Sequence, residues 1–201
     1  PVYGFIRRAG HSPADAEDLA QAYFTRFYEK RYATDFRPEA GRFRTFLRAS
    51  LSHFLANEWD RERALKRGGT RKPISLDSAT AEERYRLEPA HDLTPAALFE
   101  REWAAALLST CLQHLRREED AGGRPARFEA LKPFLVGGGS SDYVEVAREL
   151  GLAEGAVRVA VHRLRKRFGE VLREEIGRTV TDPADVDSEI RWLLTAVGGG
   201  S

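Results

Sequence analysis

Residues able to bind DNA are concentrated at 143–168, in the stretch YVEVARELGLAEGAVRVAVHRLRKRF. Ala147, Gly151 and Val157 have the spacing of a helix–turn–helix unit. Such a unit needs a small residue where its helices cross, a turn residue that tolerates positive φ, and an early apolar residue in the second helix. The second helix is predicted to pack through Val157, Ala160, Val161, Leu164, Phe168 and Val171.

The opposite face of that second helix carries the side chains with DNA-binding chemistry. The outward positions are Gly155, Arg158, Val159, His162, Arg163 and Lys166. An arginine can bind a guanine edge or a phosphate oxygen, and lysine favours phosphate. An arginine-rich face is often only a solvated face, but the glycine spacing favours DNA binding here. Val159 gains nothing from water at this place, so we expect it to pack on a thymine methyl group.

Residue types used in catalysis are dispersed along the chain. The histidines show no metal-ligand spacing; they are His11, His53, His91, His114 and His162. The VGGGSS segment lacks the lysine of a phosphate-binding loop, and Cys111 is alone, which excludes a disulfide framework and a cysteine-based zinc site. The sequence therefore predicts neither an enzyme nor a metal or cofactor site.

Composition sets weak bounds on the partners. The chain has 201 residues, enough for one large or two small domains, and its 32 Lys and Arg nearly balance its 31 Asp and Glu. Any nucleic-acid surface must therefore be local. No apolar run approaches the ~20 residues of a membrane helix, and no signal peptide is visible, so we expect a cytoplasmic protein. A start at Pro1 without any methionine indicates a missing natural N-terminus.

Almost every strong periodicity is helical, which predicts an all-α fold. Ser12 and Pro13 are a helix start signal. The helix that follows packs through Ala16, Leu19, Ala20, Tyr23, Phe24 and Phe27. A long helix from residue 43 packs through Phe43, Leu47, Leu51, Phe54 and Leu55. With a helix tail at 1–10, these form a first domain over 1–67.

The rest of the chain divides at composition changes. Residues 68–93 lack a sustained period and are predicted to be a linker. Thr94 caps the first helix of a second domain over 94–180, which contains the helix–turn–helix at 143–168. An extension over 181–201 holds a last helix with an apolar stripe of Val186, Ile190, Leu193, Leu194 and Val197. We expect that stripe to pack on the second domain, with the linker or a partner as alternatives.

Two stretches together resemble the bacterial ECF (extracytoplasmic function) sigma factors. The first is DAEDLAQAYFTRFYEK, with Asp-Leu-x-Gln and an aromatic residue three positions on. The second is GRFRTFLRASLSHFLANEWDRERALKRGG, with Arg-Thr-aromatic-Leu before a polar, arginine-rich helix. The resemblance covers nearly the whole chain, with the predicted helix–turn–helix at the place of sigma domain four. It implies a subunit without catalysis that gives RNA polymerase its choice of promoter.

The resemblance also implies a role for each domain. Sigma domain two binds the clamp helices of the largest core subunit and opens the −10 element; sigma domain four lies on the flap and binds the −35 element. The implied core-binding residues are Asp18, Gln21, Thr25 and Glu29. The implied −10 residues are Phe36, Arg48, Ser52, His53, Asn57, Trp59, Arg61 and Arg63. The implied −35 residues are Arg158, Val159, His162, Arg163 and Lys166.

The chain departs from the family pattern at several of these places. Ala22 replaces a usual acid, Val159 and Ala160 replace a usual Ser and Arg, and His53 stands where Asn is common. The chain is similar to the subgroup associated with Ser/Thr kinases, so phosphorylation of Thr25, which adds about −1.5 to −2 charges, is a hypothesis for restoring the missing acid. A solvated threonine is the simpler reading. A free-standing helix–turn–helix regulator is the alternative function, but it leaves the N-terminal pattern without a role.

Overall fold

The computed structural model describes residues 1–29, 41–65, 82, 83, 85, 93–135 and 142–198, with the side chains of 62–65 outside this description. Within these ranges the chain forms eight α-helices and two short 3₁₀ helices. The isolated bridge between Arg42 and Val180 is the sole β pairing of the described residues. The described part of the chain therefore has the predicted all-α fold.

The chain separates into two compact units. Unit 1 comprises Pro1–Ala105 and Thr179–Ser201, and unit 2 comprises Ala106–Arg178. Helix α6 (Pro95–Ala121) contributes its first residues to unit 1 and the remainder to unit 2. The boundary between the two units therefore lies within α6. From the change of composition we predicted a domain boundary before Thr94.

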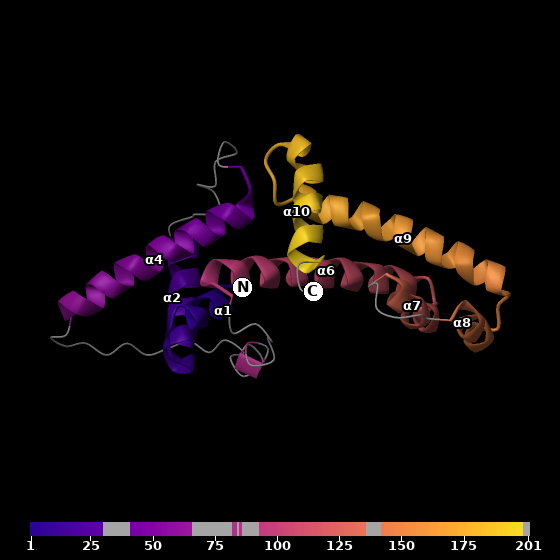
Figure 1. The fold of residues 1–201 in the computed structure, drawn as a ribbon, viewed down its shortest axis with the longest axis horizontal. Helices are drawn as coiled ribbons and strands as arrows, with labels where there is room; N and C mark the ends of the chain where they lie inside the picture. The colour runs from indigo at the N-terminus through magenta and orange to yellow at the C-terminus, as the bar shows by residue number, and fades with distance from the viewer. Residues whose placement is uncertain (30–40, 66–81, 84, 86–92, 136–141, 199–201) are drawn as a thin grey trace. The chain divides into compact units, whose positions relative to one another are not determined.

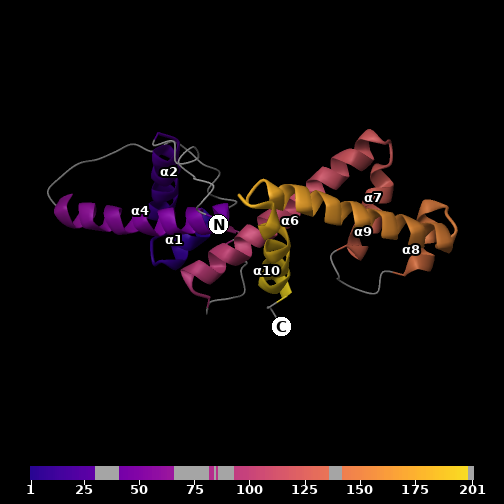
Figure 2. The same ribbon diagram turned by 90° about the horizontal axis from the view of Figure 1, so that it is seen from above.

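Unit 1 is built on three helices from the N-terminal part of the chain. They are α1 (Val2–Arg8), α2 (Pro13–Glu29) and α4 (Phe43–Leu65). Figures 1 and 2 show α2, in indigo, crossing α4, in purple. Ser12 begins α2 as expected, because its Oγ accepts a hydrogen bond of 3.2 Å from the Asp15 backbone N–H.

The core of unit 1 is rich in aromatic side chains. The predicted faces of α2 and α4 meet there: Tyr23 and Phe27 are buried beside Leu51 and Phe54. Phe99 from the start of α6 is also fully buried and lies 6.2 Å, edge to face, from Phe5 of α1. Such ring pairs favour this geometry and fix the helices at defined angles. The buried residues confirm the helical periodicity of the predicted first domain.

The C-terminal helix α10 (Val186–Gly198) belongs to unit 1, not to the second domain on which we expected it to pack. It follows a 3₁₀ helix, η3 (Pro183–Asp185), whose Asp182 cap accepts a hydrogen bond of 2.8 Å from Ala184 N–H. The predicted apolar stripe is also wrong in part, since Leu194 and Val197 are 65% and 51% exposed. Leu193 of the stripe is buried as predicted, Val186 and Ile190 are half-buried, and Glu189 is buried beside them. The covered face therefore combines ion pairs of Glu189 with part of the apolar stripe.

A part of the predicted linker contacts α1 in unit 1. Glu82 accepts hydrogen bonds from the Tyr3 hydroxyl at 2.5 Å and from Arg7 Nε at 2.9 Å. The guanidinium groups of Arg7 and Arg8 lie 4.9 and 5.7 Å from the centre of the Tyr85 ring. Burial, together with the bond to the Glu82 carboxylate, raises the pKa of Tyr3 to about 12.

Unit 2 combines the second half of α6 with three further helices. They are α7 (Pro125–Leu131), α8 (Tyr143–Leu150) and α9 (Glu154–Gly177); a 3₁₀ helix, η2 (Lys132–Phe134), follows α7. Figures 1 and 2 show α7 and α8 beside the first turns of α9, in orange. The predicted packed face of α9 is confirmed, with Val157, Ala160, Val161, Leu164 and Val171 buried and Phe168 half-buried.

An ion-pair network joins α6 to α9 within unit 2. Arg167 Nη2 lies 2.7 Å from Glu118 Oε1, and its Nη1 lies 3.2 and 3.3 Å from carboxylate oxygens of Glu170 and Glu174. The hydrogen bonds from Arg167 lower the pKa of the Glu118 carboxyl. Arg167 therefore stabilises the contact between α6 and α9, unlike the exposed arginines earlier on α9.

Candidate nucleic-acid interface

The predicted −10 residues on α4 divide between two faces of the helix. Arg48, Ser52 and Trp59 follow at spacings of four and seven, which places them on one face. His53, Asn57 and Arg61 follow at spacings of four and lie on another. The structure thus does not bring the whole predicted set together. Phe36 lies outside the described residues, and Arg63 lies on α4 with its side chain outside them.

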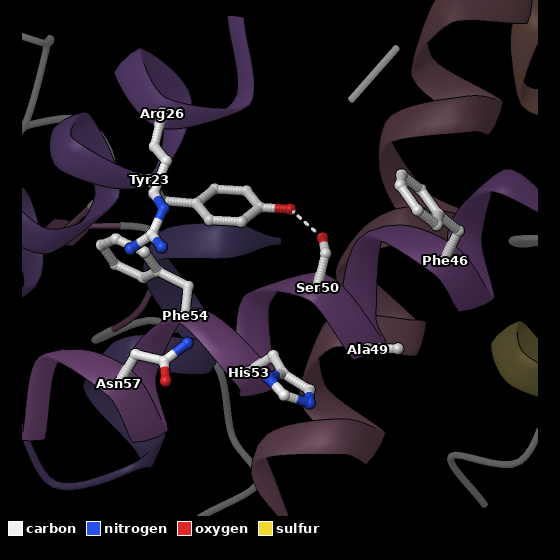
Figure 3. Close-up of a pocket in the computed structure, with 8 residues that line it drawn as sticks. All are labelled: Tyr23, Arg26, Phe46, Ala49, Ser50, His53, Phe54 and Asn57. Carbon is white, nitrogen blue, oxygen red and sulfur yellow. Dashed lines mark hydrogen bonds between the residues drawn. The ribbon is translucent and has the colours of Figure 1, made fainter. Parts of the chain in front are cut away.

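His53 and Asn57 line a cavity of about 280 Å³ between α2 and α4 (Figure 3). Its other walls are Tyr23, Arg26, Phe46, Ala49, Ser50 and Phe54. Figure 3 shows Tyr23 reaching across from α2 to Ser50, with 2.5 Å between its hydroxyl and Ser50 Oγ. The cavity combines aromatic walls with hydrogen-bonding groups, which is the chemistry that holds an unstacked base.

Arg26 is a wall residue that sequence reasoning missed. Its Nη1 lies 3.7 Å from Glu58 Oε1, an atom that also lies 3.0 Å from Arg61 Nη1. Glu58 therefore links an arginine of α2 to one of the predicted −10 residues on α4. Arg26 stands three residues after the buried Tyr23, at the edge of the packed face, and this position was the available signal.

Trp59 lies at a second hollow, of about 320 Å³. The residues around it are Ala9, His11, Leu55, Ala56, Trp59 and Asp60. The Trp59 side chain is 57% exposed, as we expected from its place on the polar face. Phe43 and Phe46 instead pack against the core through the Phe27 ring, at 6.4 Å each. Among these three aromatic side chains Trp59 is therefore the most exposed.

Arg48 is engaged within unit 1. Its Nη1 lies 2.9 Å from Glu100 Oε1 of α6, and its side chain is 36% exposed. Glu100 also forms an ion pair with Arg44, which is 6% exposed and contacts Glu189 of α10. Neither Glu100 nor Glu189 was a predicted site residue, because ion pairs between distant helices leave no local pattern.

The predicted core-binding face of α2 is largely exposed. Asp18, Thr25 and Glu29 are exposed along one side of the helix, with Ala22 between them. Gln21 is half-buried beside them. The surface that α2 presents is thus polar and acidic, suited to a basic partner.

The predicted −35 residues lie together on the exposed face of α9. Val159 is 49% exposed, and His162, Arg163 and Lys166 are exposed beside it. Arg158 is held locally: its Nη2 lies 2.5 Å from Glu154 Oε1, and its guanidinium lies 4.4 Å from the centre of the Tyr143 ring. Among the described residues no ion pair includes Arg163 or Lys166. These two cations therefore keep their charge available to an anion.

The turn before α9 has the backbone that the spacing predicted. Gly151 adopts φ 64° and ψ 31°, a left-handed conformation in which a Cβ is strained. Asp142 caps α8 by accepting a hydrogen bond of 2.8 Å from Val144 N–H. These two residues fix where α8 begins and ends, and therefore how the exposed face of α9 is presented.

Chemistry of other kinds has little support in the described ranges. There, no group of three His, Cys, Asp or Glu side chains is placed to hold a metal ion. Burial raises the pKa of the Cys111 thiol to about 11, so that cysteine is a poor nucleophile at neutral pH. Over the same ranges, no helix has both the length and the apolar character required to cross a bilayer.

Comparison with known families decides the identity of the N-terminal part. Residues 1–64 match the family profile of Sigma-70 region 2. These residues form a sigma-70 region 2 domain. No curated protein and no solved structure matches the chain. The matched residues contain α1, α2 and nearly all of α4, so they include the cavity and both faces of α4 described above.

Sigma-70 region 2 has established partners. It implies an RNA polymerase sigma factor in transcription initiation, which binds core polymerase and contacts the promoter, and sigma factors are not enzymes. The match gives no family to residues 65–201, which hold α6 to α10.

Proposed function

We propose that the chain is an ECF-type sigma factor that directs core RNA polymerase to promoters through both a −10 and a −35 element. The observation that carries this is the sigma-70 region 2 domain over 1–64, followed by an exposed basic face on α9. The region 2 domain binds core polymerase, and the basic face of α9 contacts DNA further upstream. Such a protein acts in the cytoplasm, where the polymerase is.

In unit 1 the proposed roles follow the two polar helices. Asp18, Gln21, Thr25 and Glu29 of α2 bind the clamp helices of the largest core subunit. The −10 contacts are Phe36, Arg48, Ser52, His53, Asn57, Trp59, Arg61 and Arg63. His53 and Asn57 are supported by their place at the cavity of Figure 3, whose aromatic walls suit an extruded base. Trp59 is supported by its exposure.

In unit 2, α8 and α9 act as the helix–turn–helix of sigma domain four. Arg158, Val159, His162, Arg163 and Lys166 contact the −35 element, and the same domain lies on the polymerase flap. The supporting observations are the left-handed Gly151 and the exposure of this face of α9. Arg163 and Lys166 supply phosphate or guanine contacts, and Arg158 requires release from Glu154 to do so.

A free-standing helix–turn–helix regulator is the second candidate function. The exposed α9 face suits it equally well, but it assigns no role to the sigma-70 region 2 domain. Regulators of that class are generally dimers on two-fold sites, with half-site spacing set by the dimer. Core polymerase binding therefore discriminates between the two candidates.

The test is co-purification of the chain with core RNA polymerase, followed by sequencing of the transcripts that the pair initiates. We expect a one-to-one complex whose start sites share two upstream elements. A regulator without sigma activity gives no such complex. A complex that starts transcription from a shared −10 element alone keeps the sigma assignment and removes the −35 role of α9.

We also propose that a Ser/Thr kinase regulates core binding through Thr25. Thr25 is exposed on the face of α2 where Ala22 provides no carboxylate. A phosphate on Thr25 adds about −1.5 to −2 charges to the face of α2 that is proposed to bind a basic surface of core polymerase. Core polymerase should therefore bind Thr25→Glu more tightly than Thr25→Ala; equal affinities contradict this role, because a merely solvated threonine predicts them.

A further inference from the structure

Three arginines around the start of α4 form a charged cluster with two glutamates from other helices. Arg42 Nε lies 2.8 Å from Glu189 Oε1, and Arg44 Nη2 lies 3.0 Å from the same oxygen. Arg44 and Arg48 both pair with Glu100 of α6. The cluster lies within unit 1, and its arginines belong to the region 2 domain.

The C-terminal helix covers this cluster. Glu189 of α10 is only 4% exposed, and the Trp192 ring lies over Arg44, with 3.5 Å between its centre and the guanidinium carbon. Just before it, Ser188 Oγ accepts a hydrogen bond of 2.7 Å from Arg42, and Asp185 lies 3.6 Å from the same guanidinium. Arg44 is thereby enclosed between an acidic side chain and an aromatic ring.

The covered groups have the chemistry of a phosphate-binding surface. A guanidinium fork binds a carboxylate and a phosphate in the same bidentate manner, so Glu189 occupies donors that a DNA phosphate also takes. Arg48, one turn further along α4, stands on the face of the proposed −10 contacts. DNA that follows α4 therefore passes close to Arg42 and Arg44.

We propose that α10 is an acidic cover that competes with DNA phosphates for Arg42 and Arg44. This inference rests on the proposed function, in which α4 contacts promoter DNA. It assigns to the C-terminal helix a role in limiting the DNA affinity of unit 1. Binding of DNA exchanges one anion for another at these guanidinium groups and releases the helix.

The anchoring of α10 is suited to such an exchange. Leu193 is the one apolar side chain that the described part of α10 fully buries, while Leu194 and Val197 face outward. Val186, Ile190 and Trp192 are only half-buried, and ion pairs with Arg42 and Arg44 complete the attachment. The attraction between such buried charges is largely offset by their loss of water. A polyanion that pairs with the same arginines therefore meets a small net barrier.

The direct test is Glu189→Gln in the full chain, with binding of a fluorescent DNA duplex that lacks promoter sequence. The change keeps the side-chain shape and removes the competing charge. We expect affinity to rise about fivefold at roughly 0.1 M salt, and the dependence of log K on log salt to steepen by about 1–2, the slope of one or two added phosphate contacts. Unchanged or lower affinity overturns the proposal.

Two matched variants separate the cover from a general charge effect. Asp187→Asn makes the same change in net charge at an exposed position of α10 and should leave DNA affinity near that of the unchanged chain. Adding Arg42→Gln to Glu189→Gln should remove most of the gain, because Arg42 then has no charge to offer. An equal gain from Asp187→Asn contradicts the cover.

Hydrogen exchange of the unchanged protein gives a second readout that does not depend on variant folding. Added DNA should speed amide exchange in 186–198, since a displaced helix loses its protection. Slower or unchanged exchange at saturating DNA overturns the proposal. Core polymerase binding is measured in parallel: its absence refutes the sigma assignment, and the DNA results still decide the role of α10.

Discussion

Among single residues, Val159 gives the sharpest test of DNA specificity. It is 49% exposed in the middle of the basic face of α9. Contact with a thymine methyl that removes the area of about one methyl group from water contributes about 0.8 kcal/mol, or about fourfold in affinity. We expect Val159→Ser to reduce preference for thymine by this factor in binding to promoter variants. Val144→Ser is the control, since Val144 is 48% exposed on α8, outside the proposed contacts; equal effects of the two changes contradict the contact.

The Tyr3 hydroxyl provides a pH-dependent test of the contact between α1 and Glu82. The folded pKa of Tyr3, about 12, lies above the ordinary 10, so the contact stabilises unit 1 fully below pH 10 and is lost as pH rises toward 12. The stability difference between the unchanged chain and Tyr3→Phe should therefore shrink across that interval in denaturant titrations. In an ultraviolet titration, Tyr3→Phe should lose one tyrosine that ionises near pH 12. Tyr28→Phe, a change at a residue that is 77% exposed, should retain the ionisation near pH 12. Loss of that ionisation in Tyr28→Phe contradicts its assignment to Tyr3.

At the scale of elements, the turn between α8 and α9 supports a paired prediction. Gly151→Ala places a Cβ at φ 64° and should destabilise unit 2 by about 1–2 kcal/mol in denaturant titrations. Gly155→Ala should stabilise it by about 0.5–1 kcal/mol, because Gly155 lies in the first turn of α9 with open space around an added Cβ. Opposite changes in the stability of unit 2 for the two variants distinguish backbone strain at Gly151 from a general effect of adding a methyl group. Destabilisation by both changes contradicts this account.

How far the elements follow from the sequence depends on the range of the interaction. Leu47, Leu51 and Phe54 recur at helical spacing, so local periodicity predicts α4 and its buried face. The place of α10 depends on Glu189 meeting Arg44, 145 residues away, and hydropathy instead predicted an apolar face. Tyr3 and Glu82, separated by 79 residues, likewise leave no local signal. Of the site, exposure on α9 was predictable, whereas the division of the −10 set between two faces of α4 required the structure.

For the whole molecule, the proposed function places core polymerase binding and −35 recognition on different surfaces. The acidic face of α2 and the basic face of α9 carry opposite charge and belong to different compact units. In the proposed function the α2 face binds a basic protein partner and the α9 face binds phosphate and base edges. A change on either should therefore affect one activity and spare the other.

Asp18→Lys and Arg163→Gln should accordingly give separable defects in the full chain. Reversing the charge of Asp18 should weaken core polymerase binding roughly tenfold, because rim charges determine association with a complementary partner, while DNA binding stays near normal. Arg163→Gln should leave core affinity unchanged and lower transcription from promoters with an intact −35 element by roughly tenfold, the worth of one arginine contact. Glu83→Lys, at an exposed acid outside α2, is the matched control for charge reversal. If Asp18→Lys and Glu83→Lys weaken core binding equally, the effect comes from net charge, and the face of α2 is not the attachment surface.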